Sequence, residues 1–228
     1  MGFLGKFLEL RSNSRRSGFE CVVSIIVTVA ALSACSTVPI DFSLKQTAVV
    51  PPLAAPKFSQ ERLGFSKLIF KLEPGTQFGQ LAGGTLCVNP KPLVWSAGVV
   101  GITEGQLYAA VTGELRRLGL NVSSKSEELF TVPASAESDL TLGGVVSTME
   151  RKICNSVSGI KGAVHLKVNW QLFSKRSGTV VFETSTEGSH TDLNFSTQGD
   201  SPITAAALAQ ATRAFGLQAA FAQFIRKQ

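Results

Sequence analysis

The fold is decided by the stretch Val164-His165-Leu166-Lys167-Val168-Asn169-Trp170-Gln171-Leu172, in which apolar and polar side chains alternate without a break. Strict alternation is typical of an antiparallel strand with one face in a core and the other toward solvent. A turn at Lys175-Arg176-Ser177-Gly178 follows, and Thr179 to Thr186 continues the apolar face with Val180 and Phe182. The sequence therefore predicts a long antiparallel hairpin.

Further strands are predicted on the amino-terminal side of this hairpin. Leu140 to Cys154 indicates a long strand, in which Gly143-Gly144 predicts a bulge or a close backbone approach. Leu63 to Leu72 also alternates and ends at a Glu-Pro-Gly turn. Leu81 to Val88 is a weaker strand candidate, and we expect it to end in a turn at Asn89-Pro90-Lys91-Pro92.

Two helices are predicted. Thr103 and Gln106 form a capping box, and Gly119 stands where a left-handed residue ends a helix. We expect Ser201 to cap the second helix, with Pro202 in its first turn. Its apolar face consists of Ala207, Ala211, Ala214, Leu217, Phe221, Phe224 and Ile225. This helix either packs closely on the sheet or lies on a membrane surface, and the need to cover a sheet face favours the first. The expected fold is α+β, a mainly antiparallel sheet with two helices packed on one face, in a single domain spanning 61–228.

The amino terminus has the layout of an export signal. Residues 1–20 are net positive, Cys21 to Leu32 form a short apolar run, and Leu32-Ser33-Ala34-Cys35 resembles the lipobox of bacterial lipoproteins. A run of about a dozen residues is shorter than the roughly 20 that a spanning helix needs. We therefore predict that 1–34 is a signal peptide and that Cys35 is lipidated. An uncleaved anchor helix and an ordinary signal cleaved near Ala34 are the alternatives.

The segment that follows is expected to be a tether. Residues 35–60 hold four prolines among Ala, Ser and Thr, a composition that disfavours helices and central strands. Ser36 resembles the residue that sorts lipoproteins to the outer membrane, where others carry an Asp that retains them at the inner membrane. The resemblance implies a lipid-anchored protein of the outer membrane that faces the periplasm.

Two cysteines remain after the signal and the lipidated residue are set aside. Cys87 and Cys154 are an even pair in an oxidising compartment, which predicts a disulfide rather than two buried free thiols. His165 and His190 are the only histidines, and neither has Cys-x-x-Cys spacing nearby, so no metal site is expected. His165 lies on the polar face of its strand and is expected to be solvated or at an edge.

Charge and motifs exclude several classes of function. Residues 1–34 contain four basic and two acidic side chains, so the remaining chain keeps 18 basic and 14 acidic residues and a net charge near +4. Basic residues cluster only in pairs, and we expect no nucleic-acid partner. Gly199-Asp200-Ser201-Pro202, with His190 and Asp192 nearby, superficially matches trypsin-like proteases, but a helix start explains the same residues. We expect no enzyme activity and no cofactor.

These features together resemble a group of bacterial outer-membrane lipoproteins. The capped helix ending Leu-Gly-Leu-Asn-Val, the hairpin and the Ala-rich carboxy-terminal helix are similar to the amino-terminal domain of TolB, with the curli-secretion lipoprotein and activators of penicillin-binding proteins as relatives. Glu150 to Gly188 also resembles the amino-terminal region of trypsin-like lipoprotein proteases. The resemblance implies an adaptor or assembly factor that binds an envelope protein through a strand edge or the open sheet face. A lipid or small-molecule carrier is the alternative.

Overall fold

Two long neighbouring strands form the centre of the sheet. The computed structural model describes residues 37–44, 62–96, 101–123 and 138–226, and the compact unit that contains the sheet begins at Val38. Strand β4 (Leu140–Ser156) pairs antiparallel with β5 (Gly159–Ser174) over their whole length, and β5 pairs antiparallel with β6 (Thr179–Ser196). The predicted hairpin is confirmed, and its second strand continues beyond Thr186 to Ser196.

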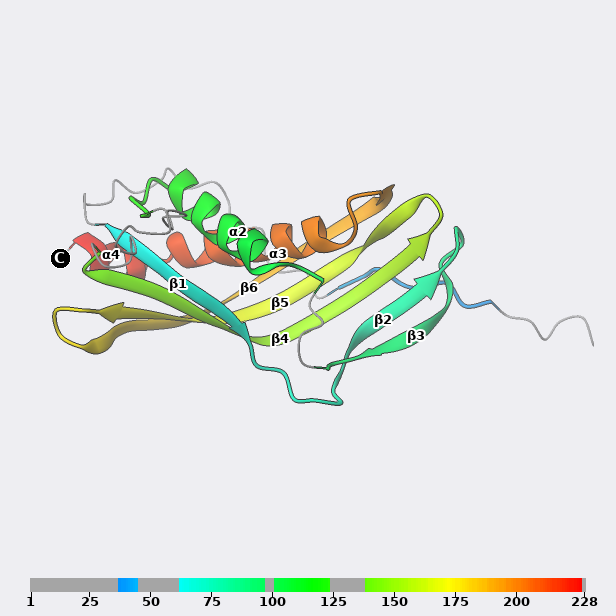
Figure 1. Cartoon of the computed structure of the whole chain (residues 1–228), viewed down its shortest axis with the longest axis horizontal. Coiled ribbons are helices and arrows are strands. Elements are labelled where there is room, and N and C mark those ends of the chain that lie inside the picture. The colour runs from blue at the N-terminus through cyan, green and yellow to red at the C-terminus, as the bar shows by residue number, and fades with distance from the viewer. Residues whose placement is uncertain (1–36, 45–61, 97–100, 124–137, 227–228) are drawn as a thin grey trace, which may run out of the picture. The chain divides into compact units, whose positions relative to one another are not determined.

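The other edge of β4 receives two short strands in succession. Strand β1 (Leu63–Phe70) pairs with the first half of β4. Strand β2 (Gln77–Gly83) pairs with residues Arg151 to Asn155, near the end of β4. Both pairings are parallel, whereas β3 (Val88–Val94) runs antiparallel to β2. The six-stranded sheet is thus mostly antiparallel, with the order β3-β2-β4-β5-β6 and β1 beside β4 (Figure 1).

The prediction for residues 81–92 was wrong in its boundaries. The turn lies at Gly84–Cys87, and the expected turn Asn89–Pro92 belongs to β3. Strand β3 is at the edge of the sheet, where proline is tolerated because a missing backbone donor on the outer side breaks no ladder.

Three helices are described rather than the two predicted. Helix α2 (Glu104–Arg117) has the predicted Thr103 capping box, and Gly119 adopts φ 86° just beyond its end. The expected second helix is divided into α3 (Ser201–Gly216) and α4 (Ala219–Arg226). The Gln218 N–H bonds to the Phe215 carbonyl, a tight turn that ends α3, and the ring centroid of Phe221 then lies 4.4 Å from that of Phe215.

Asp200, not Ser201, occupies the position before α3, and its side chain makes no capping bond. No helix in the described ranges is long and apolar enough to cross a membrane.

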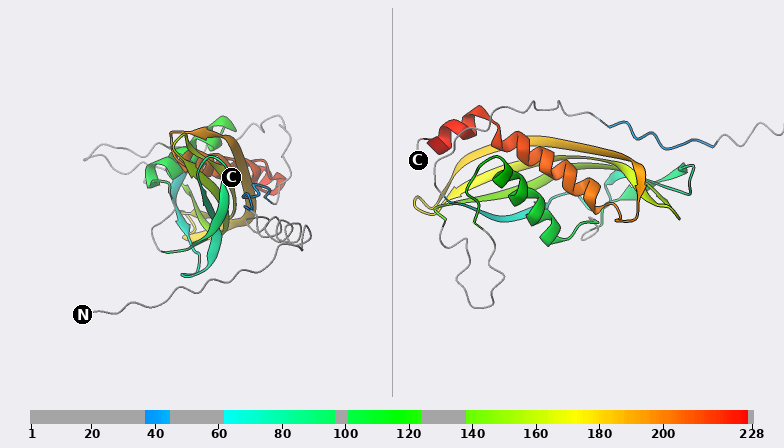
Figure 2. Two further views of the ribbon diagram at one scale, coloured as in Figure 1. Left: turned by 90° about the vertical axis from the view of Figure 1, so that its right-hand side faces the viewer. Right: turned by 90° about the horizontal axis from the view of Figure 1, so that it is seen from above.

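One row of paired residues across the sheet carries the helix layer. Phe65 pairs with Leu142, Leu142 with Leu172, and Leu172 with Phe182, so these four side chains share a face. Phe65 contacts Tyr108 of α2, and Phe182 contacts the aromatic rings of α3 and α4. The helices therefore lie over this face, as Figures 1 and 2 show.

Helix α3 approaches β6 closely, as its alanines predicted. A Cβ placed on Gly188 would lie 2.1 Å from the Ala207 carbonyl oxygen. At the same place the buried Trp170 indole donates a hydrogen bond to the Thr186 hydroxyl, which in turn donates one to the Ala211 carbonyl. Each of these hydrogen bonds is 2.7 Å long. This polar chain attaches α3 to the sheet.

Candidate functional site: the open face of the sheet

The sheet face opposite the helices, called here the open face, carries exposed apolar side chains. Ile69 of β1, Phe173 of β5 and Val180 of β6 are 45%, 39% and 44% exposed. Ile69 pairs with Val145, and Phe173 pairs with Val180, so all point away from the helix layer. Apolar side chains that gather on one face of a folded domain are a recurring mark of an interaction site.

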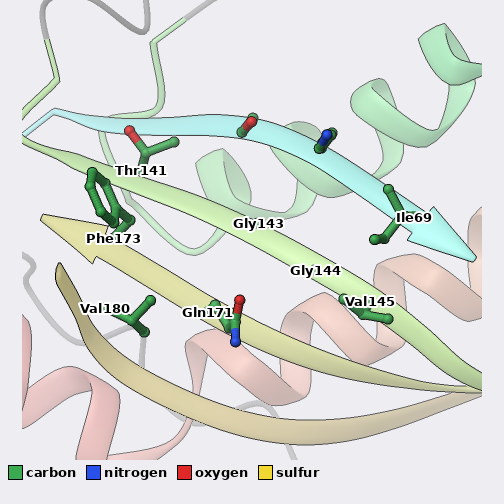
Figure 3. A pocket seen from close by; sticks show the side chains of 10 residues that line it. Ile69, Thr141, Gly143, Gly144, Val145, Gln171, Phe173 and Val180 are labelled. Atoms are coloured by element: carbon green, nitrogen blue, oxygen red, sulfur yellow. The ribbon is translucent and has the colours of Figure 1, made fainter. Parts of the chain in front are cut away.

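A shallow groove of about 350 Å³ runs among these side chains (Figure 3). Gly143 forms part of its floor, and a Cβ placed there would have only the Lys67 carbonyl oxygen within 4 Å, at 3.8 Å. The neighbouring Gly144 faces the helices, where its missing side chain makes room for Leu68 and the Trp170 ring. The groove thus exists because β4 has no side chain at position 143. The predicted close backbone approach is replaced at Gly144 by a close approach of the Leu68 and Trp170 side chains, and the bulge lies between Val146 and Thr148.

Polar groups at the groove are few. The hydroxyl oxygen of Thr141 is buried and has no hydrogen-bond partner among the described residues. The Gln171 amide lines the groove and donates to Glu183 Oε1 over 2.8 Å. Such a surface can take up an apolar side chain and offer the Thr141 hydroxyl to its backbone.

The other end of the open face is covered by residues 38–44, called here the strap. The Ile40 N–H donates to the Cys87 carbonyl, and the Asn89 N–H donates to the Val38 carbonyl, so the strap pairs with the start of β3. Ile40 is buried against Ala82, Cys87 and Cys154. These residues fall within the range predicted as a tether, and this part of it packs on the domain.

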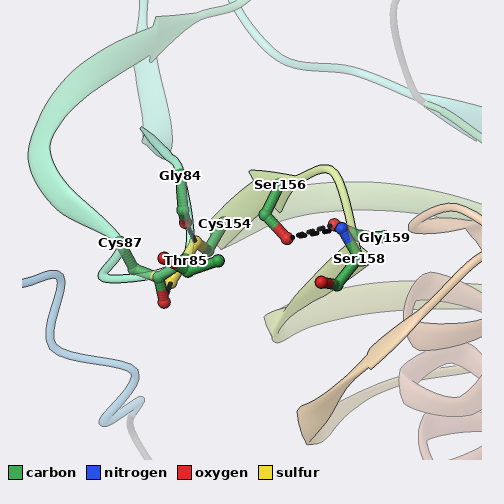
Figure 4. Close-up of a disulfide and its surroundings, with 7 residues drawn as sticks. All are labelled: Gly84, Thr85, Cys87, Cys154, Ser156, Ser158 and Gly159. Carbon is green, nitrogen blue, oxygen red and sulfur yellow. Dashed lines mark hydrogen bonds between the residues drawn. A yellow bond between two sulfur atoms is a disulfide. The ribbon is translucent and has the colours of Figure 1, made fainter.

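The predicted disulfide is confirmed beneath the strap. Cys87 and Cys154 are bonded, with their Cα atoms 5.5 Å apart, and join the β2–β3 turn to β4 (Figure 4). A backbone hydrogen bond of 2.9 Å from Gly84 to Asn155 ties the same two elements. Cys35, the predicted lipidation site, lies outside the described residues.

Charged groups surround the strap in a second, more polar groove of about 650 Å³. The Lys152 ammonium donates to the Ser43 carbonyl and lies 3.5 Å from Glu150. Hydrogen bonds from the Ser43 hydroxyl and then its N–H lower the pKa of Asp41, and the charge of Lys152 adds to this shift. These contacts hold the strap in place.

Two buried ionisable groups lie near these grooves. His165 is on the polar face of β5, as predicted, but it is buried rather than solvated, with Nε2 3.8 Å from Glu187. Arg151 points into the helix layer, pairs with Asp200 at the start of α3 and lies over the Phe78 ring; burial lowers its pKa. Arg151 therefore joins β4 to α3 and serves the fold.

The structure does not assemble a serine triad. The Ser201 hydroxyl accepts a hydrogen bond of 3.0 Å from the Gln106 amide, and within the described part of the chain Ser201 makes no hydrogen bond to His190. Within the same ranges no group of three potential metal ligands occurs. The groove was not predicted from the sequence. Gly143 is the residue that marks it, but a glycine in a strand can equally indicate a bulge, a bend or a close approach of another group.

The chain is similar to known proteins in three-dimensional structure but not in sequence family. No family model and no curated protein sequence matches the chain. Among solved structures it is similar to protein XCC0632 from Xanthomonas campestris, of family model DUF330, with 16% identity, TM-score 0.46, and coverage of 80% of this chain and 97% of that one. It is also similar to lipoprotein GNA1162 from Neisseria meningitidis, with 12% identity, TM-score 0.33, and coverage of 60% and 88%. The PelC dodecamer protein from Paraburkholderia phytofirmans has 15% identity, TM-score 0.35, and coverage of 73% and 96%.

Proposed function

We propose that this protein is an outer-membrane lipoprotein, anchored through Cys35 and facing the periplasm, that acts as a non-catalytic adaptor or assembly factor for an envelope protein complex. The observation that carries the adaptor role is the open-face groove with its exposed Ile69, Phe173 and Val180. The lipobox-like sequence supports the anchor, and the Cys87–Cys154 disulfide fits an oxidising compartment.

The shape of the groove favours a protein partner over a carried lipid. A carrier encloses most of its ligand, and pockets for small ligands bury 70–90% or more of the ligand surface. The groove at Gly143 is open along one side, and the space between sheet and helices is filled by large buried side chains such as Trp170, Phe215 and Phe221. An apolar side chain of a partner protein fits such an open groove.

The test is photo-crosslinking in cells from the groove itself. A benzoyl-phenylalanine in place of Phe173 should yield a defined crosslinked product with an envelope protein, identified by mass spectrometry. The matched control is the same replacement at Gln210, an exposed position of α3 on the helix layer. Equal products from both positions, or none from position 173, would contradict the proposal.

A second variant separates docking from folding. Gly143→Leu fills the groove, and the free space around its Cβ predicts an unchanged urea midpoint. The crosslink from position 173 should then be lost while the protein remains folded and in the membrane. A crosslink that persists in this variant would show that the partner binds elsewhere.

A further inference from the structure

The end of the sheet beneath the strap carries a second group of exposed apolar side chains. Leu86 in the β2–β3 turn is 77% exposed, Val157 in the β4–β5 turn is fully exposed, and Val38 in the strap is 60% exposed. Gly83 pairs with Asn155, and Val38 bonds to β3 just after Cys87, so all three lie at one end of the sheet. Figure 1 shows both turns at this end, opposite the β5–β6 turn.

The two turns are held rigidly together. The Cys87–Cys154 disulfide and the hydrogen bond from Gly84 to Asn155 link them, and the Ser158 N–H bonds to the Ser156 hydroxyl within the β4–β5 turn (Figure 4). The apolar side chains therefore project from fixed backbone positions. When they are buried in another surface, only side-chain conformational entropy is lost, because the backbone is already ordered.

The chemistry of the turns suits the edge of a bilayer. Their sequences, Gly84-Thr85-Leu86-Cys87 and Asn155-Ser156-Val157-Ser158-Gly159, combine one large apolar residue each with small hydroxyl or amide residues and contain no charge. Burying an unpaired charge in an apolar medium is very costly, whereas hydroxyl groups at the headgroup level keep hydrogen-bond partners. An apolar tip surrounded by such groups can enter the outer part of the acyl layer.

The anchor places the same end at the membrane. Cys35 precedes Val38 by three residues, and three extended residues span about 10 Å at most. Because Val38 accepts a hydrogen bond from Asn89 of β3 and Ile40 donates one to Cys87, acyl chains on Cys35 would hold this end of the sheet within that distance of the headgroups.

We infer that Val38, Leu86 and Val157 form a membrane-docking tip, which inserts into the bilayer that holds the lipid anchor, while the open-face groove lies toward the other end of the sheet, beside the β5–β6 turn. This inference rests on the proposed anchoring at Cys35. It goes beyond the adaptor role because it assigns the bilayer, rather than a protein, as the partner of these two turns.

The test measures depth with tryptophan. The full-length lipidated variants Leu86→Trp and Val157→Trp are reconstituted in phosphatidylethanolamine and phosphatidylglycerol vesicles with brominated acyl chains, which quench nearby indoles. Both native tryptophans, Trp95 and Trp170, are buried and give a constant background. The matched control is Ser177→Trp, an exposed position in the turn at the other end of β5.

We expect the fluorescence of the introduced tryptophan in Leu86→Trp and Val157→Trp to shift to shorter wavelength and to be quenched by the brominated acyl chains. The fluorescence of the introduced tryptophan in Ser177→Trp should be unaffected. Lipidated protein that floats with vesicles while all three variants emit alike would overturn the docking tip and leave the anchor intact. Protein whose intact mass shows no lipid on Cys35 would overturn the anchor and the inference together. Crosslinking of position 86 between two protein molecules, without quenching, would assign the turns to a second copy and also overturn it.

Discussion

Gly188 is a position where one added methyl group should disturb the packing of α3 against the sheet. Its Cβ in a Gly188→Ala variant would lie 2.1 Å from the Ala207 carbonyl oxygen and 2.5 Å from the Ala211 nitrogen, and real Cβ contacts essentially never fall below 3.0 Å. Both obstacles are backbone atoms of α3 and cannot rotate away. The helix must therefore move outward from β6 by about 1 Å, a displacement that overpacking studies associate with costs of about 1–3 kcal/mol.

The cost should fall at the upper end of that range. Movement of α3 also stretches the 2.7 Å bond from the Thr186 hydroxyl to the Ala211 carbonyl, which belongs to the chain that satisfies the Trp170 indole. We expect Gly188→Ala to lower the free energy of unfolding by about 3 kcal/mol, because a weakened buried hydrogen bond adds to the steric term.

Urea unfolding followed by tryptophan fluorescence measures this directly, since Trp170 is buried next to Phe215 and responds to movement of α3. The control is Gly143→Ala in the same sheet, where the new Cβ meets only one oxygen at 3.8 Å and should leave stability nearly unchanged. If Gly188→Ala unfolds within about 0.5 kcal/mol of the parent, the range of ordinary surface substitutions, the packing argument is refuted.

Three further predictions concern charges and the disulfide. Asp200→Asn removes the carboxylate that pairs with the buried Arg151 and should lower the free energy of unfolding, measured in urea, by about 3 kcal/mol. The control Asp139→Asn, which breaks an exposed pair with Arg176, should change that free energy by less than about 0.5 kcal/mol. Replacing both Cys87 and Cys154 by Ala removes a covalent link between residues 67 positions apart and should lower the free energy of unfolding by about 4 kcal/mol. An unchanged free energy of unfolding would contradict the presence of the disulfide. Because the pKa of Asp41 is lowered in the folded protein, its contribution is present above the ordinary value of 3.8 and is lost as pH falls from there through the lowered pKa of the folded protein; proteolysis of the strap should therefore be constant near pH 6 and increase progressively as pH is lowered below 3.8.

Elements with a local signal were predicted well. The alternation around Trp170 defined β5 and its hairpin, and the capping box at Thr103 defined the start of α2, because each signal lies within a few adjacent residues. The cysteine count was also sufficient for the disulfide. Parallel pairing of β1 and β2 with β4 has no such signal, since the strands involved are separated by many residues.

Sequence patterns alone were sufficient for β1, β4, the β5–β6 hairpin and α2, for the pairing of Cys87 with Cys154, and for the resemblance of the amino terminus to a lipoprotein signal. Long-range packing was needed to place β3, to separate α3 from α4, and to bring the strap over one end of the open face, with the groove at Gly143 nearer the other end. The physical reason is that alternation and capping act between near neighbours, whereas a groove and a covered face arise from packing between residues distant in the chain.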